Sequence, residues 1–567
     1  MKNILKKRDL ASFLVIISFL LILQTPMIWN HSVNFSGDAL FHYNRFYDAM
    51  MQIKQHNFQP LYTFYGFHST MRVTNAIYSP VLAYFLGIIA WVSGSWFKFD
   101  LIVNTLMGIS IAVCFWRLFN LQRLSSYPTR ILIILLVLTS NNYISWIMQH
   151  QFNTIGAIPL ILIVTIIVRM YQDIDRPINT LELTFSMALV TQTHMLSTIF
   201  AILLLIPSTL VATFWWKNKL LNWKKIMLSV IGTIILTTNI WIPYIYLTSR
   251  NKISTPGASK ISDNITHFMR DNYNWNGTIT IALSTVIFVV LTIGILCWKK
   301  NNRTTKVLLI ISWILLFLQT NIVPWDYISS NFNFINILQF PFRFNFILII
   351  TVLSLIAQYL SDYEKIVSKS HKEVLLIFIS GFALMNFMIV YQNIWESNQN
   401  YLQNTSAPIQ NPDNGLLGSV IEARKSFTEH NLQESLLKNS RGTSDYLTGT
   451  NGSYKDYNSI VFVNNYKYDK KVINSQVILK WRSDEQGRIV VPIAYYSGLI
   501  SQLNGTPIDN QTDAHGFLVV NSKKGNNQLI VEQDTPTIIY VSYLVPALFL
   551  TVLLAFVCYK KLMKSRI

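Results

Sequence analysis

The sequence predicts a polytopic α-helical membrane protein with an extracellular β-sandwich domain. Of its 567 residues, 51% are hydrophobic and 13% are charged, which is roughly half the charged share of an ordinary globular chain. Apolar runs recur from residue 10 to residue 394, and one more covers 541–559. Such runs are long enough to cross a bilayer. Helices satisfy their own backbone hydrogen bonds in lipid, so we expect these runs to be helical.

Basic residues predict how the spans are oriented. They gather at both termini and in short loops at 117–130, 217–225, 299–306 and 364–372, all of which we place in the cytoplasm. The net charge of +19 then reflects topology, and no nucleic-acid partner is expected. Segment 76–93 cannot cross in this scheme, so we predict a juxtamembrane helix on the outer face. About twelve spans follow, near residues 10–29, 100–118, 131–148, 153–170, 181–196, 197–214, 226–247, 278–298, 306–323, 341–360, 374–393 and 538–559.

The spans divide the chain into three predicted parts: a transmembrane domain at 1–394 with an outer loop at 31–99, an extracellular domain at 395–537, and a final helix with a basic tail at 538–567. The second half of the extracellular domain alternates apolar and polar residues between Gly, Asn and Asp turns, which is typical of strands. Its predicted strands are SIVFVNNY, QVILKW, GRIVVPIAYY, GFLVVNS and NQLIVEQ. The polar stretch 411–450 is predicted to be helix or loop.

The outer loop holds the first candidate for chemistry. Asp38, His42 and Arg45 follow the first span at positions i, i+4 and i+7, and on a helix they would share one face. The alternative is an ordinary amphipathic helix with Asp38 in its first turn and Ser36 as its cap. Arg45 and Arg72 could bind phosphate or lie solvated at the lipid surface. No metal-ligand spacing joins the loop's histidines, so no metal residues are assigned.

A second group of polar residues lies at the predicted outer ends of later spans. His150 and Asn153 follow one another between two spans, and Gln192 and His194 mark another turn. Ionisable groups at membrane depth usually face a cavity, although packing through helix–helix hydrogen bonds is the competing explanation. Arg343, in the motif LQFPFRF, lies at the outer mouth of a span. It is a candidate for binding phosphate or for anchoring the helix at the interface.

Taken together, these segments make the chain resemble the YfhO-like family of bacterial membrane proteins, which has the GT-C glycosyltransferase architecture. The resemblance runs through GDALFHYNR, YSPVLAYFLGIIAWVSG, THMLST, LQFPFRF, GTSDYLTG and IVVPIAYYSGLISQLNGTPI. Asp445 and Thr448 stand where the family is expected to carry Glu and Pro. The resemblance implies an enzyme of the bacterial cell membrane, with both termini cytoplasmic and an extracellular active face. It would transfer a sugar from a polyprenyl-phosphate donor to a cell-envelope polymer, such as teichoic acid or another polysaccharide.

The mechanism implied by the resemblance gives each candidate a role. Asp38 would be the general base, with His42 or His194 orienting it or the donor. Arg343, with Arg45 or Arg72, would bind the donor phosphate. His150, Asn153, Gln192 and His194 would line the substrate cavity; no cofactor is assigned, and a divalent metal stays open. Two other functions remain: a transporter or flippase for a lipid-linked saccharide, and a non-catalytic envelope-assembly protein.

Overall fold

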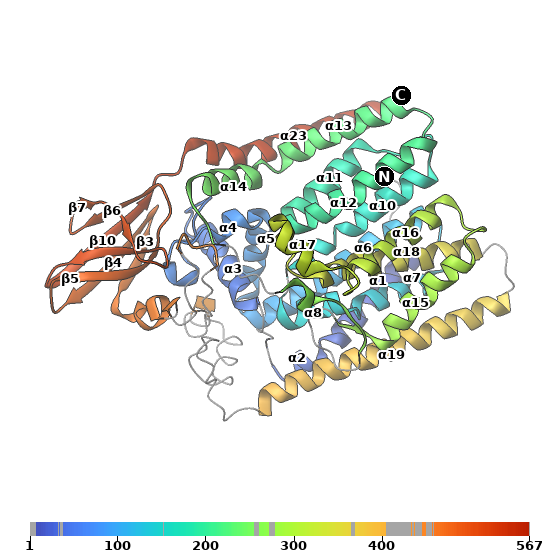
Figure 1. Ribbon diagram of the computed structural model, residues 1–567, viewed down its shortest axis with the longest axis horizontal. Helices are drawn as coiled ribbons and strands as arrows, with labels where there is room; N and C mark the ends of the chain where they lie inside the picture. Colours follow the sequence, from blue (N-terminus) through green and yellow to red (C-terminus); the bar gives the residue numbers. More distant parts are fainter. Residues whose placement is uncertain are drawn as a thin grey trace. The chain divides into compact units, whose positions relative to one another are not determined.

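The structure is a computed structural model that describes residues 7–31, 33, 38–150, 152–254, 260–270, 278–363, 369–403, 432, 433, 436, 445–449, 456, 457 and 459–565. Contacts within the chain divide it into two compact units. Unit 1 comprises Met1–Asp38, Asp100–Ile231 and Ala258–Gln403. Unit 2 comprises Ala39–Phe99, Gly232–Gly257 and Asn404–Ile567. Each unit is described by itself below (Figure 1).

Unit 1 is built from helices, together with two short paired strands, β1 (His267–Arg270) and β2 (Thr278–Thr280). Its N-terminal helices are α1 (Lys7–Leu23), α2 (Thr25–Trp29), most of α6 (Trp96–Leu121), α7 (Tyr127–Leu138), α8 (Asn141–Gln149), α9 (Asn153–Ala157) and α10 (Leu160–Gln172). The later ones are α11 (Thr180–Thr193), α12 (Met195–Ala212), most of α13 (Lys219–Leu236), α15 (Ile281–Leu296), α16 (Arg303–Leu318), α17 (Trp325–Asn331), α18 (Asn345–Tyr363) and α19 (Lys369–Gln403).

Six helical segments among the described residues are long and apolar enough to cross a membrane, or eight if each of two bent pairs counts as one span. All six coincide with predicted spans: Trp96–Leu121, Asn153–Gln172, Met195–Trp215, Pro341–Asp362, Leu376–Glu396 and Thr537–Phe556. The two bent pairs, α7 with α8 at 51° and α13 with α14 (Thr238–Arg250) at 64°, cover predicted spans 131–148 and 226–247. The chain thus has the expected membrane character, while the count of about twelve spans is not confirmed.

The four remaining predicted spans differ from the structure for local reasons. The segment 10–29 is divided at Gln24, between α1 and α2, and Pro26 lies in the first turn of α2; proline is tolerated at a helix start but not in a helix interior. The segment 181–196 ends early, because His194 takes an extended conformation with φ −157° and begins α12. Predicted spans 278–298 and 306–323 correspond to α15 and α16, which have 16 residues each.

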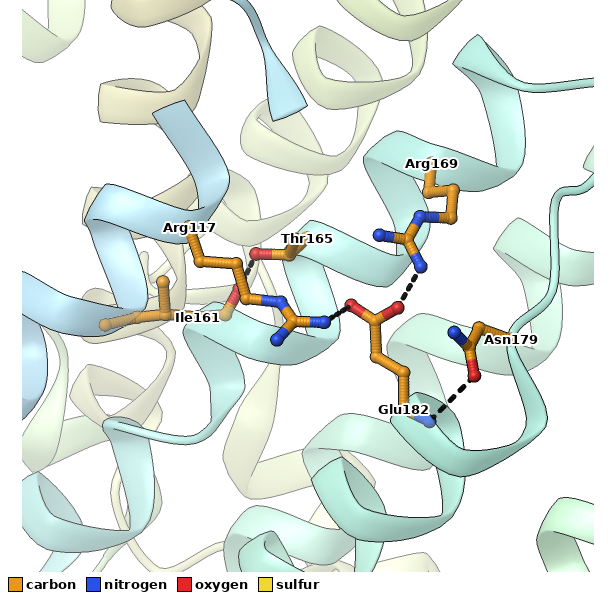
Figure 2. A network of polar contacts seen from close by, with 6 residues as sticks. All are labelled: Arg117, Ile161, Thr165, Arg169, Asn179 and Glu182. Carbon is orange, nitrogen blue, oxygen red and sulfur yellow. Dashed lines mark hydrogen bonds and ion pairs between the residues drawn. The ribbon is translucent and has the colours of Figure 1, made fainter. Parts of the chain in front are cut away.

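An ion-pair network aligns the ends of three helices of unit 1 (Figure 2). Glu182, in the first turn of α11, accepts Arg117 Nη2 of α6 at 2.6 Å, and its other oxygen accepts Arg169 of α10. Asn179 caps α11 by accepting the Glu182 backbone N–H at 3.2 Å. The C-terminal ends of α6 and α10 and the start of α11 therefore lie at one level, as expected if the α6–α7 and α10–α11 loops are on the same side of a membrane.

The helices of unit 2 are α3 (Ala39–Lys54), α4 (Thr74–Ile77), α5 (Pro80–Ser93), α14 and α23 (Thr537–Ser565). α5 starts with Pro80 in its first turn and ends at Gly94, whose φ of 71° is the left-handed conformation that terminates helices. Segment 76–93 is therefore mainly a 14-residue apolar helix, shorter than the stretch that normally spans a bilayer. Its place on the outer face stays a prediction.

The C-terminal part of unit 2 contains two antiparallel sheets (Figure 1). The five-stranded sheet has the order β3-β4-β10-β6-β7 and the three-stranded sheet β5-β9-β8. The strands are β3 (Asp469–Ile473), β4 (Gln476–Ser483), β5 (Gly487–Ala494), β6 (Leu499–Leu503), β7 (Thr506–Ile508), β8 (Gln511–Thr512), β9 (Phe517–Ser522) and β10 (Gly525–Gln533). Both sheets bury side chains in a common hydrophobic core, and Trp481 Nε1 of β4 donates to Ser522 Oγ of β9 at 3.0 Å. These features agree with the predicted sandwich.

Individual strands were predicted with mixed success. QVILKW, GRIVVPIAYY, GFLVVNS and NQLIVEQ correspond to β4, β5, β9 and β10. The prediction for SIVFVNNY is wrong, because Ser459–Val463 forms a turn of π-helix. The LNGT turn is confirmed: Asn504 and Gly505 both have positive φ, 52° and 81°, and join β6 to β7, as in a two-residue hairpin. The stretch 411–450 lies almost wholly outside the described residues.

Candidate functional site

The structure separates the three outer-loop residues that were predicted to share one helical face. Asp38 is an exposed turn residue directly before Ala39, the first residue of α3. His42 and Arg45 lie inside α3 and are buried; Arg45 Nη1 is 3.1 Å from His42 Nδ1. Asp38 therefore lies at the start of the helix, whereas His42 and Arg45 form a buried imidazole–guanidinium pair within it. The predicted cap, Ser36, is outside the described residues.

Arg45 is fully buried and is bound on several sides. Its Nε donates to Asn75 Oδ1 at 3.1 Å, its Nη2 donates to the Ser79 carbonyl at 3.3 Å, and the guanidinium lies 4.5 Å from the centre of the Tyr78 ring. Burial lowers the pKa of Arg45 to about 10, so the group keeps its charge at neutral pH. These contacts tie α3 to the segment that leads into α5.

Asp48 is the residue of α3 that the sequence reasoning missed. Its carboxylate is fully buried and accepts the backbone N–H groups of Tyr65 at 2.8 Å and Gly66 at 3.2 Å. Its other oxygen accepts Gln52 Nε2 at 2.7 Å. Burial raises the pKa of Asp48 to about 6, although these hydrogen bonds oppose the shift. Arg45, Asp48 and Gln52 lie at i, i+3 and i+7 and so share one face of α3. This spacing is the sequence signal that could have revealed Asp48.

The loop after α3 has a strained backbone. Phe67, His68, Ser69 and Met71 all have φ between 52° and 57°, a region that side chains with a Cβ seldom adopt. Such strain persists only where surrounding contacts hold it in place. Lys470 Nζ of β3 donates to the His68 carbonyl at 2.7 Å. Burial, reinforced by the charge of Lys470, lowers the pKa of His68 to about 3.

Arg72 ends this loop and is also fully buried. Its guanidinium donates to the Tyr457 hydroxyl at 3.2 Å and to the Asp445 carbonyl, and it lies 5.0 Å from the centre of the Phe67 ring. Asp445 belongs to the GTSDYLTG motif, whose first three residues are outside the described part. Thr448 of the same motif donates its hydroxyl to the Tyr495 carbonyl at 2.8 Å. A proline, which the family pattern leads one to expect, could not make that bond.

Unit 1 contains a separate pocket that brings together three of the predicted site residues. Arg343, His194 and Asn153 line a small hollow that is partly open to solvent. The other lining residues are Asn142, Ala157, Leu160, Ser197, Phe200, Phe346 and Ile347. The pocket is thus mixed: a cation, an imidazole and amides on one hand, and aromatic and aliphatic side chains on the other.

Local sequence explains how Arg343 reaches this pocket. Pro341 opens a short 3₁₀ turn, Pro341–Phe344, directly before α18. Within that turn the Arg343 guanidinium donates to the Leu338 carbonyl at 2.8 Å and to Gln339 Oε1 at 3.0 Å, and it lies 4.7 Å from the centre of the Phe340 ring. These two neutral oxygens and the aromatic ring orient the guanidinium. Arg343 therefore brings a positive charge to the pocket wall.

His194 is placed by the direct junction of α11 and α12. His194 is the N-cap residue of α12. Its Nδ1 accepts the Ser197 backbone N–H at 3.3 Å and lies 3.0 Å from Ser197 Oγ. Gly156 of α9 approaches this junction so closely that an added Cβ would lie 2.3 Å from the His194 Cβ. The glycine allows α9, and with it Asn153, to pack against His194.

The remaining predicted cavity residues lie outside this lining. His150 Nε2 is 3.0 Å from Asp100 Oδ1, and both side chains are buried. Gln192 belongs to the last turn of α11. Asp100 was missed, because no local spacing links it to a residue fifty positions later in the chain. Among the residues that the structure describes, no three His, Cys, Asp or Glu side chains come together as ligands for a metal.

Comparisons with known proteins leave the family open. No family model matches the sequence, and no curated protein matches it. Among solved structures, the chain is similar to arabinosyltransferase EmbB from Mycobacterium smegmatis, with a TM-score of 0.40 and 10% sequence identity. The match covers 94% of this chain and 64% of that chain. A likeness of this size does not decide the function, and membership of the YfhO-like family stays a prediction.

Proposed function

We propose that this protein is a membrane glycosyltransferase of the GT-C type that uses a polyprenyl-phosphate-linked sugar as its donor. Its acceptor would be a cell-envelope polymer, such as teichoic acid or another polysaccharide, on the outer face of a bacterial membrane. The observation that carries the proposal is the pocket of Arg343, His194 and Asn153. A polyprenyl phosphate is an anionic head on an apolar tail, and this pocket offers a cation beside apolar walls.

The location of the pocket supports the same ligand. Asn153, Met195 and Pro341 begin three of the candidate spans, and pocket residues lie at or next to each of these starts. The pocket is therefore at the ends of membrane-spanning segments, where a lipid phosphate lies. We assign the phosphate contact to Arg343 ahead of Arg45 and Arg72, because burial and hydrogen bonds within unit 2 already hold those two.

The proposed reaction needs one base and one cation. Asp38 takes the proton from an acceptor hydroxyl, whose oxygen forms a bond to the anomeric carbon of the donor sugar. The bond between that carbon and the phosphate oxygen breaks, and polyprenyl phosphate leaves with the electron pair. Arg343 stabilises the phosphate, since a guanidinium matches phosphate oxygens in charge and geometry. Asp38 is exposed, as a base for a polymeric acceptor must be.

Broken helices keep the flippase as a second candidate, because transporters often carry such breaks at their binding sites. Packing holds one side of the break between α7 and α8. Asn386 of α19 donates to Thr139 Oγ1 at 2.6 Å and accepts from Thr280 Oγ1. Thr139 at this bend is thus bound to other elements, whereas Ser140 Oγ and Asn142 Nδ2 are buried without a hydrogen-bond partner among the described residues. Asn142 also lines the pocket of Arg343 and His194, so the flippase stays the second candidate.

The test is sugar transfer from a polyprenyl-phosphate sugar in membranes that contain Asp38→Asn protein. General acid–base catalysis typically contributes about 10²–10⁴-fold, so we expect transfer to fall by ~100-fold or more at unchanged protein level. Asp484→Asn, at an exposed turn between β4 and β5, is the matched control and should keep full activity. Full activity of Asp38→Asn would remove Asp38 as the base. If transfer is absent from the wild type but lipid-linked sugar crosses vesicle membranes, the flippase is the better assignment.

A further inference from the structure

The ion-pair network of Arg117, Arg169 and Glu182 carries more positive than negative charge (Figure 2). One carboxylate receives two guanidinium groups, so the three side chains together hold a net charge of +1. Glu182 is nearly buried, with 7% of its side chain exposed, whereas 51% of the Arg117 side chain is exposed. Among the described residues, Glu182 is the only carboxylate paired with Arg117. The excess charge therefore lies at the surface, on Arg117.

An exposed apolar face of α6 leads to Arg117. Ile102, Leu106 and Val113 are 40–52% exposed, and with Arg117 they occupy positions i, i+4, i+11 and i+15, which lie on one helical face. These residues belong to the candidate span Trp96–Leu121, so lipid is the medium that this face contacts.

A second exposed face starts beside Glu182, on α11. Leu181, Phe185 and Leu189 repeat every four residues and are 37–47% exposed. The Arg117–Glu182 pair joins the two helices. The surface thus has a cationic head from which two apolar faces extend.

We propose that this surface binds an anionic phospholipid, with its phosphate on Arg117 and its acyl chains along the exposed faces of α6 and α11. Arg169 acts as a positioning residue, because it holds the second oxygen of Glu182 and so fixes the carboxylate that orients Arg117. A guanidinium next to the membrane surface attracts anionic headgroups and matches phosphate oxygens geometrically.

This lipid site is separate from the proposed donor pocket. Asn153 lines the pocket at one end of the candidate span Asn153–Gln172, whereas Arg169 belongs to the network at the other end. A 20-residue helix covers about 30 Å, which is the thickness of the hydrocarbon core. The two sites would therefore face opposite leaflets, and the network would lie on the leaflet of the basic loops.

The test measures lipid binding to the purified full-length protein in detergent, by thermal stability at increasing lipid concentration and by native mass spectrometry. The probes are phosphatidylglycerol, phosphatidylcholine with the same acyl chains, and inorganic phosphate. For the wild type we expect saturable stabilisation by phosphatidylglycerol, beyond that given by the other two. Arg117→Gln should weaken it about fivefold, which corresponds to ~1 kcal/mol per interfacial cation.

Arg303→Gln is the matched control, because it removes an exposed arginine at the start of α16. It should leave phosphatidylglycerol binding unchanged. Arg117→Lys keeps the charge without the planar guanidinium and should bind phosphatidylglycerol with intermediate strength. It replaces the Gln variant in the test if that variant is unstable. Equal phosphatidylglycerol binding by Arg117→Gln and wild type would overturn the proposal. So would stabilisation by inorganic phosphate or by phosphatidylcholine equal to that by phosphatidylglycerol.

Discussion

Replacement of Asp48 by Asn tests how the carboxylate at the centre of α3 acts. The side chain is fully buried and accepts two backbone N–H groups, from Tyr65 and Gly66, together with Gln52 Nε2. Asn keeps one oxygen in the same place but cannot titrate. Its amide nitrogen cannot accept from Gln52 Nε2, but that loss does not depend on pH. The pH dependence of the difference between the two proteins therefore reports the ionisable proton.

The sign and size of the effect follow from the pKa of Asp48. Burial raises it from 3.8 to about 6, so between these pH values the folded state keeps a proton that the unfolded state has lost. The free energy of unfolding of the wild type therefore falls as pH rises through this window. A shift of that size corresponds to ~3 kcal/mol. The stabilisation is complete below pH 3.8 and is lost above pH 6.

The measurement compares thermal unfolding of wild type and Asp48→Asn in detergent at pH 4, 5, 6 and 7. We expect the wild type to lose stability relative to the variant by ~3 kcal/mol across the series. Asp484→Asn should show no such trend, because Asp484 is exposed. Asp48→Ala should be destabilised at every pH, since each buried N–H left without an acceptor costs about 1–3 kcal/mol. A constant difference between Asp48→Asn and wild type at all four pH values would refute the reasoning.

Four further predictions concern Arg343, Gly66, Lys470 and Lys98. Arg343→Lys keeps the charge but loses the fork, so the KM for the donor should rise roughly tenfold in a sugar-transfer assay; an unchanged KM would reduce Arg343 to an anchor. Gly66→Ala should unfold at a temperature several degrees lower, because its Cβ would lie 2.3 Å from the Asn44 carbonyl oxygen, whereas Gly381→Ala, with nothing within 4 Å, should not. Burial lowers the pKa of Lys470 to about 7, so the wild type should gain stability from pH 7 to 9 and Lys470→Met should lack that gain. A cysteine at Lys98 should react with an impermeant thiol reagent in whole cells if residues 76–93 do not cross.

The fold was predictable where hydrophobicity alone decides. All six long apolar helices were found, because a bilayer requires the same run of residues in any sequence. Breaks depend instead on single residues whose effect is local. Pro26 lies just beyond the division of the first span, and the extended backbone of His194 separates α11 from α12. A count of apolar residues does not detect such positions, so the predicted number of about twelve spans is not confirmed.

The candidate site was predictable only in part, because sequence spacing shows which residues share a helix and not what packs against it. Asp38, His42 and Arg45 were grouped by spacing, yet the structure exposes the first and buries the other two. Arg343 and His194 are 149 positions apart in the sequence and line one pocket. Only the tertiary packing of separate spans brings them together.

The three predicted phosphate-binding arginines differ in burial, and burial decides which of them can contact a substrate. A guanidinium that acts on a substrate must reach a space the substrate can enter. Arg45 and Arg72 are fully buried, and withdrawing either from its hydrogen bonds would leave buried acceptors unpaired, at about 1–3 kcal/mol for each group. Arg343 instead lies in a pocket wall, where the Leu338 carbonyl and Gln339 Oε1 orient its guanidinium. Arg343 borders a hollow that is partly open to solvent, whereas Arg45 and Arg72 are fully buried, which makes Arg343 the cation on which the proposed chemistry should depend.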